Sequence, residues 1–400
     1  MKRRTTFSLA AVALAAALPM GVAQAQGAPI KIGAVAPKTG PLAGGAAVTQ
    51  WPAIKMWVTQ VNDRGGLKMK DGSQRKIELI EYDDRTNPGE AIKAVERLAT
   101  TDKADFIIAP YGTGINLAVA PVFAKYGYPQ IAVSSITDKV GELTKRYPTL
   151  FFTLGNTTAL ASSVADVLGK LAAEGKIGRK VAMVNVADAF GIELAEAARP
   201  IFKAKGLEIV YDKSYPLGTQ DLSPVMKGAK AANPDAFVAF SYPPDTFALA
   251  EQAKIENLNV KAYYSAVATP FPAFGGKFGK SAEGVLGVGG INHDAPEIQG
   301  WYAAHKKITG SDADYWASPV TYASLQVLEQ AVEGTGGVDK AAVTDFIKKN
   351  SFKTILGNWT FKDQAIEQFW TVGQWQGGKF VGVASTGKGG EKPVALKTGW

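Results

Sequence analysis

The sequence predicts an α/β protein built from two doubly wound lobes of similar topology. Short apolar runs rich in β-branched residues alternate with helix-patterned segments, and this alternation occurs twice along the chain. Near-continuous apolar strands with helices between them are typical of a parallel sheet that helices cover on both faces. The length also favours two lobes, because a single core stops growing at about 250–300 residues and this chain has 400.

The elements follow from the spacing of the apolar residues. Short runs that are apolar at most positions predict strands at 30–36, 77–82, 105–109, 130–133, 180–186, 207–211, 236–240, 262–265 and 284–288. Segments with the 3.6-residue apolar period predict helices at 51–61, 88–99, 117–126, 158–173, 193–203 and 247–256. The Asn87-Pro88 pair is a typical helix start, because proline suits the first helical position.

The two halves repeat one arrangement. Residues 105–137 and 235–269 both run through Asp, an apolar strand, a turn, a helix, a second strand and a loop with hydroxyl side chains. Ligands of open parallel sheets bind beyond the carboxyl ends of the strands. The repeat therefore predicts two facing edges. We call residues 112–114 with 134–137 the first lip, and residues 242–246 with 265–269 the second lip.

The first lip has the sequence Gly112-Thr113-Gly114 between a strand and a helix. We expect the Thr113 hydroxyl to cap the helix. The first backbone N–H groups and the positive end of the helix dipole would suit a ligand carboxylate. The alternative is a tight structural turn that binds nothing. A dinucleotide fingerprint is excluded, because it needs glycine where Leu117 stands.

The second lip carries Asp245 within Tyr242-Pro-Pro-Asp-Thr. A partly desolvated carboxylate at this place would pair with a ligand ammonium. The alternative is a helix N-cap, since Asp before a helical run is a good cap by composition alone. Tyr242 and Ser265 belong to the same lip. Other aromatic residues near the lips are candidates to line a pocket or to pack in the core, namely Tyr111, Tyr263, Tyr264 and Phe271.

Three segments resemble those of a known family, the periplasmic binding proteins of branched-chain amino acid (Leu/Ile/Val-binding-like) transporters. They are KIGAVAPKTGPLA, EYDDRTNPGEAIKAVERLAT and VAMVNVADAFGIELAEAARP, and the resemblance spans 30 to about 383. It implies two Rossmann-like lobes joined by three crossover strands, near 150–154, 269–276 and 368–370. Lobe 1 would comprise 26–150 plus 272–367, and lobe 2 would comprise 151–271 plus 368–400, with late strands in FWTVGQW and KFVGVA.

The resemblance also implies roles for individual residues. The loop of Ser134, Ser135 and Thr137 would hold the ligand's carboxylate together with the glycine turn. Phe190 stands where amino-acid binders usually have Tyr, and Phe-Phe-Thr at 151–153 lacks the Arg common at that point. Both departures make the expected pocket less polar. The implied partner is an inner-membrane ABC permease.

Other chemistries find little support in the sequence. There is no Cys, and the only two histidines are His293 and His305, so no metal site is expected. Neither HExxH nor GxSxG occurs. The segment 275–281 resembles a phosphate-binding Walker A loop but is one residue short. Asp83-Asp84 is interpreted as a turn. The charge of +8 comes without basic runs interleaved with aromatic residues, so nucleic acid is not an expected partner.

The N-terminus predicts export. Lys2-Arg3-Arg4 precedes an uncharged run from Phe7 to Val22, and Ala23-Gln24-Ala25 forms a small-x-small cleavage site, which together are typical of a secretory signal peptide over 1–25. A membrane anchor would need about 20 apolar residues. Sec export is the default and twin-arginine export the alternative. A freely soluble periplasmic monomer is the resulting expectation.

These features predict a periplasmic solute-binding protein without a cofactor. It would capture an amino acid, branched-chain or aromatic, or a related small carboxylate by closing its two lobes. An aromatic acid or an amide is the alternative ligand. The alternative classes are a ligand-binding partner of a sensor protein and a secreted α/β hydrolase.

The signal peptide gives the first testable prediction. Removal of 1–25 should leave a periplasmic protein whose N-terminal residue is Gln26, because signal peptidase cuts after the small-x-small motif. N-terminal sequencing of the protein released by osmotic shock measures this. Recovery of the chain in a membrane fraction with Met1 retained would show that the apolar run is an anchor.

Overall fold

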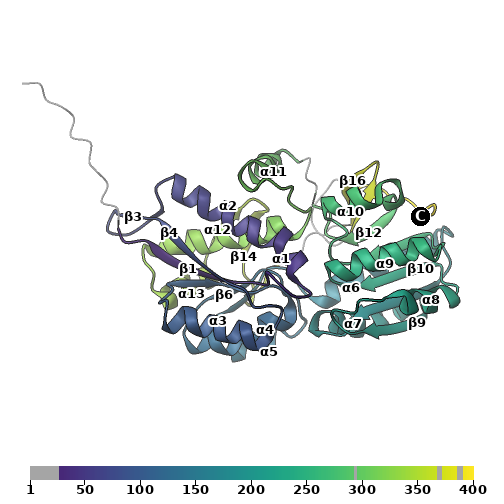
Figure 1. The fold of residues 1–400 in the computed structure, drawn as a ribbon, viewed down its shortest axis with the longest axis horizontal. Coiled ribbons are helices and arrows are strands. Elements are labelled where there is room, and N and C mark those ends of the chain that lie inside the picture. Colours follow the sequence, from purple (N-terminus) through teal and green to yellow (C-terminus); the bar gives the residue numbers. More distant parts are fainter. Residues whose placement is uncertain (1–26, 292–294, 367–371, 385–390) are drawn as a thin grey trace, which may run out of the picture.

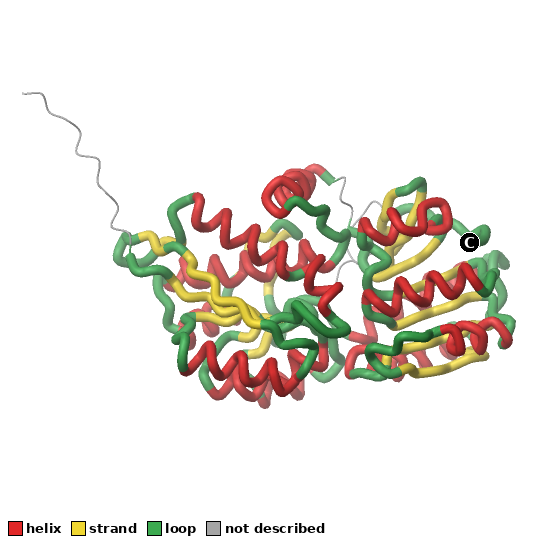
Figure 2. Tube along the Cα trace, viewed as in Figure 1, coloured by secondary structure: helices red, strands yellow, loops and turns green. Residues whose placement is uncertain are grey.

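The structure is a computed structural model that describes residues 27–291, 295–366, 372–384 and 391–400. Two α/β lobes lie side by side along the long axis of the molecule (Figure 1). Helices cover the strands of each lobe on both faces (Figure 2). The predicted fold class, two doubly wound lobes, is confirmed. The signal peptide predicted over 1–25 lies outside the described residues.

Lobe 1 contains five parallel strands. Three strands form one ladder, in the order β4 (Ile77–Tyr82), β1 (Ile30–Val35) and β5 (Phe106–Ile108). Strand β6 (Gln130–Ala132) contacts β5 and pairs in parallel with β7 (Leu150–Phe152). The helices of this part are α1 (Ala43–Thr49), α2 (Trp51–Asp63), α3 (Pro88–Thr100), α4 (Thr113–Lys125), α5 (Val140–Arg146), α11 (Pro296–Thr309), α12 (Ala317–Thr335) and α13 (Lys340–Lys349). Two small hairpins join β2 (Leu67–Lys68) to β3 (Gln74–Arg75) and β13 (Ser351–Thr354) to β14 (Gly357–Thr360).

Lobe 2 contains one seven-stranded sheet. Its order is β16 (Lys379–Ala384), β15 (Val372–Gln376), β12 (Val285–Val288), β11 (Ala262–Ser265), β10 (Ala236–Phe240), β8 (Lys180–Val186) and β9 (Glu208–Tyr215). Its helices are α6 (Thr157–Ala173), α7 (Ala189–Ala204), α8 (Ser223–Ala231), α9 (Pro243–Ile255), α10 (Pro272–Phe278) and the 3₁₀ turn η1 (Gly279–Ala282). The late strands β15 and β16 are antiparallel additions, and they join this lobe as the sequence predicts.

The internal repeat is visible in the strand order. Counted within each lobe, the parallel strands lie in the order 2-1-3-4-5, which is a common order of doubly wound sheets. A hydrogen bond repeats as well. Asp105 accepts from the backbone N–H of Lys31 at 2.9 Å, and Asp235 accepts from that of Lys180 at 2.9 Å. In both lobes an Asp that precedes the third strand is thus tied to the start of the first strand.

Local signals explain where several helices begin. Asn87 accepts a hydrogen bond from Glu90 N–H, and Pro88 occupies the first position of α3, as the sequence predicts. The turn before it uses both acids, since Arg85 N–H donates to Asp83 and Thr86 N–H donates to Asp84. The helices α4, α7 and α9 begin four residues earlier than the apolar period alone predicts, because turn and capping residues form their first turns.

The predicted boundary at 272, where the chain would leave lobe 2 for lobe 1, is wrong for the segment that contains β12. Strand β12, which the prediction assigns to lobe 1, pairs in parallel with β11 and antiparallel with β15 in the lobe 2 sheet. Helix α10 stays in this lobe, where Phe274 contacts Phe247 of α9 with ring centroids 5.6 Å apart. The chain passes to lobe 1 only between β12 and α11, which packs on α2. A fifth parallel strand completes the sheet before the chain leaves it.

Of the other two predicted crossovers, the structure describes only the first. The first lies between β7, paired in lobe 1, and α6, which packs on α7 of lobe 2, close to the predicted 150–154. The third, predicted at 368–370, lies outside the described residues. The remaining division of the chain stays a prediction. In the described part of the chain, no helix is long and apolar enough to span a bilayer.

The place of β12 in lobe 2 gives the second prediction. A methyl group at Gly287 would lie 2.4 Å from the Thr269 Cβ, so Gly287→Ala should lower the free energy of unfolding by about 1–3 kcal/mol through overpacking. Gly276→Ala is the matched control, because nothing lies within 4 Å of its added methyl group and alanine favours the helix. Urea denaturation measures both. An unchanged stability of Gly287→Ala would contradict the packing of β12 against this loop.

Candidate interlobe binding site

The first lip is formed at the carboxyl end of β5. Gly112 has φ = 90° and is the N-cap residue of α4, a backbone conformation that favours glycine. The prediction that Thr113 caps the helix is wrong. Thr113 is the first helical residue, and its hydroxyl is hydrogen-bonded to Ile136, with the backbone N–H at 3.3 Å and the carbonyl at 3.5 Å. The N-cap residue offers no side-chain cap to α4, and the Thr113 N–H faces the Tyr242 hydroxyl, so the amides after Thr113 are the ones available to an acceptor.

The loop of 134–137 is tied to the glycine turn. Gly112 N–H donates to the Ser134 hydroxyl at 3.0 Å, and this hydroxyl donates to the Pro110 carbonyl at 3.2 Å. Ser135 is fully buried, and its hydroxyl oxygen has no partner among the described residues. An unpaired buried hydroxyl costs free energy. Ser135 and the amides around Gly114 are therefore the polar groups of this lip that remain free for a ligand.

Thr137 does not remain free. Its hydroxyl donates to both carboxylate oxygens of Glu193, at 2.9 Å each, and Asp138 N–H donates to the same carboxylate at 2.7 Å. Glu193 lies on α7 of lobe 2. The side chain predicted to hold a ligand carboxylate thus holds a carboxylate of the protein itself.

The second lip is formed at the carboxyl end of β10. Tyr242 is the N-cap residue of α9, and the Asp245 carboxylate accepts a hydrogen bond from Tyr242 N–H at 3.4 Å. Asp245 therefore helps to cap the helix without being its N-cap residue. Its side chain is 3% exposed, so the carboxylate is desolvated as the sequence predicts for a ligand-facing acid.

Ser265 is engaged inside lobe 2. The Ser265 hydroxyl lies 3.0 Å from the Ser241 hydroxyl. The Ser241 hydroxyl lies 2.7 Å from the Thr246 hydroxyl, which donates to the Val267 carbonyl. This chain of hydroxyl groups joins β10, α9 and β11. The structure gives Ser265 a structural role in this network, and its place in the ligand site stays a prediction.

Aromatic rings form a wall between the lips. The Tyr242 ring lies 6.4 Å from the Tyr111 ring of lobe 1 and 5.0 Å from the Phe190 ring at the start of α7. All three side chains are 5% exposed or less. Tyr263 belongs instead to the lobe 2 core, where it stacks on Phe237 at 4.8 Å. The wall would suit the apolar part of a small ligand.

The structure adds a second acid that sequence reasoning missed. Asp188 follows β8, caps α7 by accepting from Gly191 N–H at 3.0 Å, and accepts from the Tyr242 hydroxyl at 3.0 Å. Its position before Phe190 is a recognisable N-cap signal. Only the neighbouring ends of β8, β9 and β10 bring it beside Asp245 and Tyr215, whose hydroxyl interacts with the Asp245 carboxylate.

The electrostatics of the second lip disfavour two charged acids. Burial raises the pKa of Asp245 to about 6, and the charge of Asp188 contributes to the rise. Burial also raises the pKa of Asp188. Burial and the charge of Asp188 raise the pKa of the Tyr242 phenol, whereas the Thr113 backbone N–H lowers it. Among the described residues, no hydrogen bond or ion pair joins either acid to Lys or Arg. A cationic ligand group would relieve this repulsion.

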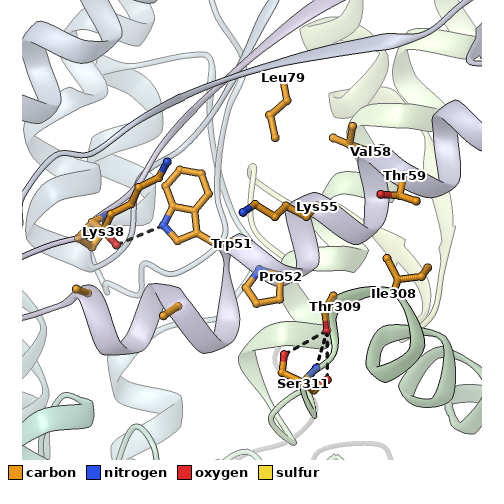
Figure 3. Close-up of a pocket in the computed structure, with 13 residues that line it drawn as sticks. Lys38, Trp51, Pro52, Lys55, Val58, Thr59, Leu79, Ile308, Thr309 and Ser311 are labelled. Atoms are coloured by element: carbon orange, nitrogen blue, oxygen red, sulfur yellow. Dashed lines mark hydrogen bonds between the residues drawn. The ribbon is translucent and has the colours of Figure 1, made fainter.

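A separate groove of about 810 Å³ lies in lobe 1, among α1, α2, β4 and the end of α11 (Figure 3). The Lys38 ammonium lies 4.7 Å from the Trp51 ring centroid and pairs with Glu81 at 2.6 Å. The predicted lip residues do not line this groove. The size of this groove alone does not make it the binding site.

The remaining candidates for other chemistries do not form sites. No cluster of His, Asp and Glu that could hold a metal ion occurs in the described part of the chain. The His305 ring is hydrogen-bonded to the Ser311 carbonyl at 3.0 Å, and His293 lies outside the described residues. The Walker-like segment 275–281 forms the end of α10 and the turn η1 rather than a loop before a helix.

The raised pKa of Asp245 gives the third prediction. Between the usual value of 3.8 and about 6, the folded protein binds more protons than the unfolded chain, so its stability falls as pH rises through this range. Asp245→Asn should therefore stabilise the ligand-free protein at pH 7 by up to about 3 kcal/mol, at 1.36 kcal/mol per pKa unit. The gain should vanish near pH 4. Urea denaturation at both pH values measures it, and a loss of stability at pH 7 would show that Asp245 is mainly a cap.

The family model described as "Periplasmic binding protein" matches residues 29–379. A Leu/Ile/Val-binding protein homolog 7 from Brucella abortus is 26% identical over 400 residues, covering 92% of this chain and 94% of the relative. The Leu/Ile/Val-binding protein of Escherichia coli is 24% identical over 340 residues, covering 84% and 87%.

Solved structures share the fold. A branched-chain amino acid transporter substrate binding protein from Streptococcus pneumoniae, in complex with isoleucine, has a TM-score of 0.76 at 20% identity and covers 90% of this chain and 99% of its own. A solute binding protein of an ABC transporter from R. palustris, in complex with benzoate, has a TM-score of 0.77 at 18% identity and covers 92% and 99%. By its two-lobed fold and by the match over most of its length, the chain belongs to the periplasmic binding protein family.

Proposed function

We propose that the protein is the periplasmic substrate-binding component of an ABC importer and that it captures an amino acid, branched-chain or aromatic, by closing its lobes. The observation that carries the proposal is the opposite chemistry of the two lips. The first offers uncapped helix amides and the free Ser135 hydroxyl, which bind acceptors. The second offers two desolvated acids, Asp188 and Asp245.

A zwitterion fits this arrangement. Its carboxylate would lie at the N-terminus of α4, where amides and the helix dipole favour negative charge. Its ammonium would lie beside Asp245, where it would offset the cost of two buried carboxylates. The apolar side chain would pack on Tyr111, Phe190 and Tyr242. Closure and binding are then one equilibrium, because the ligand contacts both lobes.

An aromatic acid or an amide is the second candidate ligand. Phe190 lacks the hydroxyl of a tyrosine, and the R. palustris neighbour was solved with benzoate. The acids of the second lip argue against a ligand that is only an anion, because a like charge would enter a site that already holds two carboxylates. They are compatible with an amide, whose N–H groups could donate to Asp245.

The biological context follows the same proposal. The signal peptide over 1–25 would deliver a soluble monomer to the periplasm, where an inner-membrane permease would accept the loaded form. A sensor protein that recognises the closed lobes would use the same site. A secreted hydrolase is not favoured, since family relatives are named as binding proteins and His305 is engaged by Ser311 away from the lips.

The fourth prediction separates the two ligand classes. Asp245→Asn keeps the size of the side chain and removes its charge, so affinity for the amino acid should fall by about 2–4 kcal/mol as a buried ammonium loses its charged partner. For an acid without an amine, the same substitution should leave affinity unchanged or improve it. Isothermal titration calorimetry with isoleucine, phenylalanine, benzoate and benzamide measures both effects.

Glu251→Gln provides the control, because this acid lies on the same helix α9 but pairs with Lys277 at the surface. It should bind every compound as the wild type does. If Asp245→Asn bound isoleucine as tightly as the wild type, the ammonium would not lie beside Asp245. The ligand would then have to be sought among compounds without a cationic group.

A further inference from the structure

The place of the Tyr111 ring in the aromatic wall depends on a glycine of α1. A methyl group built on Gly45 would lie 2.5 Å from the Tyr111 hydroxyl oxygen and 2.6 and 2.9 Å from the ring carbons Cζ and Cε1. Non-bonded carbon atoms make their best contact at about 3.5–4.0 Å. The tip of the ring therefore occupies space that exists only because residue 45 has no side chain.

Packing, and no polar contact, holds the ring in this place. The Tyr111 hydroxyl forms no hydrogen bond in the described part of the chain, although the residue is buried. Burial and the charge of Asp314 raise the pKa of the phenol, so it is neutral. Asp314 is itself fixed at the start of α12, where it accepts hydrogen bonds from the N–H groups of Ala317 and Ser318 at 2.9 and 2.6 Å. The contact with Gly45 thus decides where the ring lies.

Gly45 is placed where the two lobes meet. Helix α1 packs on α2 and α12 of lobe 1 and contacts α9 of lobe 2, and it lies at the boundary between the lobes (Figure 1). Because a close-packed interior transmits strain, a side chain at 45 would displace the Tyr111 ring rather than a helix that is held by two others. The Tyr242 ring, 6.4 Å away, is the neighbour toward which the displaced ring would move.

We propose that Gly45 is a specificity-determining residue that sets the size of the ligand's apolar part. The inference rests on the proposed function, in which this part packs on Tyr111, Phe190 and Tyr242. Without a side chain at 45, the Tyr111 ring lies back against α1 and leaves room for a large group, such as the side chain of isoleucine or phenylalanine. With a methyl group at 45, the ring would occupy part of that room. Gly45 is thus a positioning residue that acts through Tyr111.

The test compares the same substitution at two neighbouring positions of α1. Gly45→Ala should lower the ratio of the association constants for free phenylalanine and free alanine about tenfold or more, because the lost space excludes the larger side chain. Gly44→Ala is the matched control and should keep the ratio of the wild type, because nothing lies within 4 Å of its added methyl group. Isothermal titration calorimetry measures both ratios, and valine and isoleucine complete the size series. Benzoate and acetate give the same comparison for acids without an amine.

A second substitution shows whether the effect passes through Tyr111. The atoms that clash all belong to the tip of the ring, which leucine lacks. In the Tyr111→Leu background, Gly45→Ala should therefore leave the ratio for phenylalanine and alanine unchanged. Urea denaturation tests the same contact without a ligand. Gly45→Ala should lower the folding equilibrium constant about tenfold in the wild-type background. It should leave this constant unchanged or raise it in the Tyr111→Leu background, because alanine favours a helix. Circular dichroism verifies that each variant is folded.

Two outcomes would overturn the proposal. The folded Gly45→Ala variant could keep the size preference of the wild type, or its effects could persist in full in the Tyr111→Leu background. Failure of the proposed function has a different signature, since no free amino acid would then bind the wild type. The ratio for benzoate and acetate would in that case still test the size of the site, and the urea measurements would still decide whether Gly45 positions Tyr111.

Discussion

The candidate interlobe site depends on one constraint, the parallel direction of five strands in each lobe. Because parallel strands all end at the same edge of a sheet, the loops after β5, β6, β8 and β10 emerge together rather than on opposite edges. The order 2-1-3-4-5 occurs in both lobes, so two such edges exist. The crossovers turn them toward each other, and residues more than one hundred positions apart come into contact, as Tyr111 and Tyr242 do.

The same geometry creates an energetic conflict in the second lip. Asp188 and Asp245 begin neighbouring helices, where the helix dipole favours an acid, but burial and their mutual repulsion disfavour two charges. A protein selected for stability alone would place a neutral residue at Asp245. Such a cost is characteristic of functional sites, because a cationic partner would offset it on binding.

The hydrogen-bond donors of the first lip serve both the fold and the candidate binding site. Some donors of the first lip form hydrogen bonds within the lip, as Gly112 N–H does with Ser134. Others form hydrogen bonds to lobe 2, as the Thr137 hydroxyl does with Glu193. What remains for a ligand is a small set, the amides at the start of α4 and the Ser135 hydroxyl. The balance between protein acceptors and ligand acceptors at these donors would contribute to the affinity for the ligand.

Much of the fold follows from sequence because its signals are local. The apolar period located β4, β8, β10 and β11 to the residue, and Asn87-Pro88 located the start of α3. The starts of α4, α7 and α9 were less accurate, since their first turns consist of turn and capping residues rather than of the apolar period. Strand β12 was assigned to the wrong lobe, because its neighbours in the sheet are a non-local choice that an apolar run does not specify.

The sequence by itself determined the family, the repeat and the segments that form the lips, because strand and helix periods and the order of motifs are properties of the chain; it did not locate Asp188. It also did not determine which residues of those segments are free. Ser134, Ser265 and Thr137 have the same hydroxyl chemistry as Ser135, yet the structure engages the first three with Pro110, Ser241 and Glu193 and leaves only Ser135 unpaired. Hydrogen-bond partners are decided by side chains that fold close together in space, and only the tertiary structure brings them there.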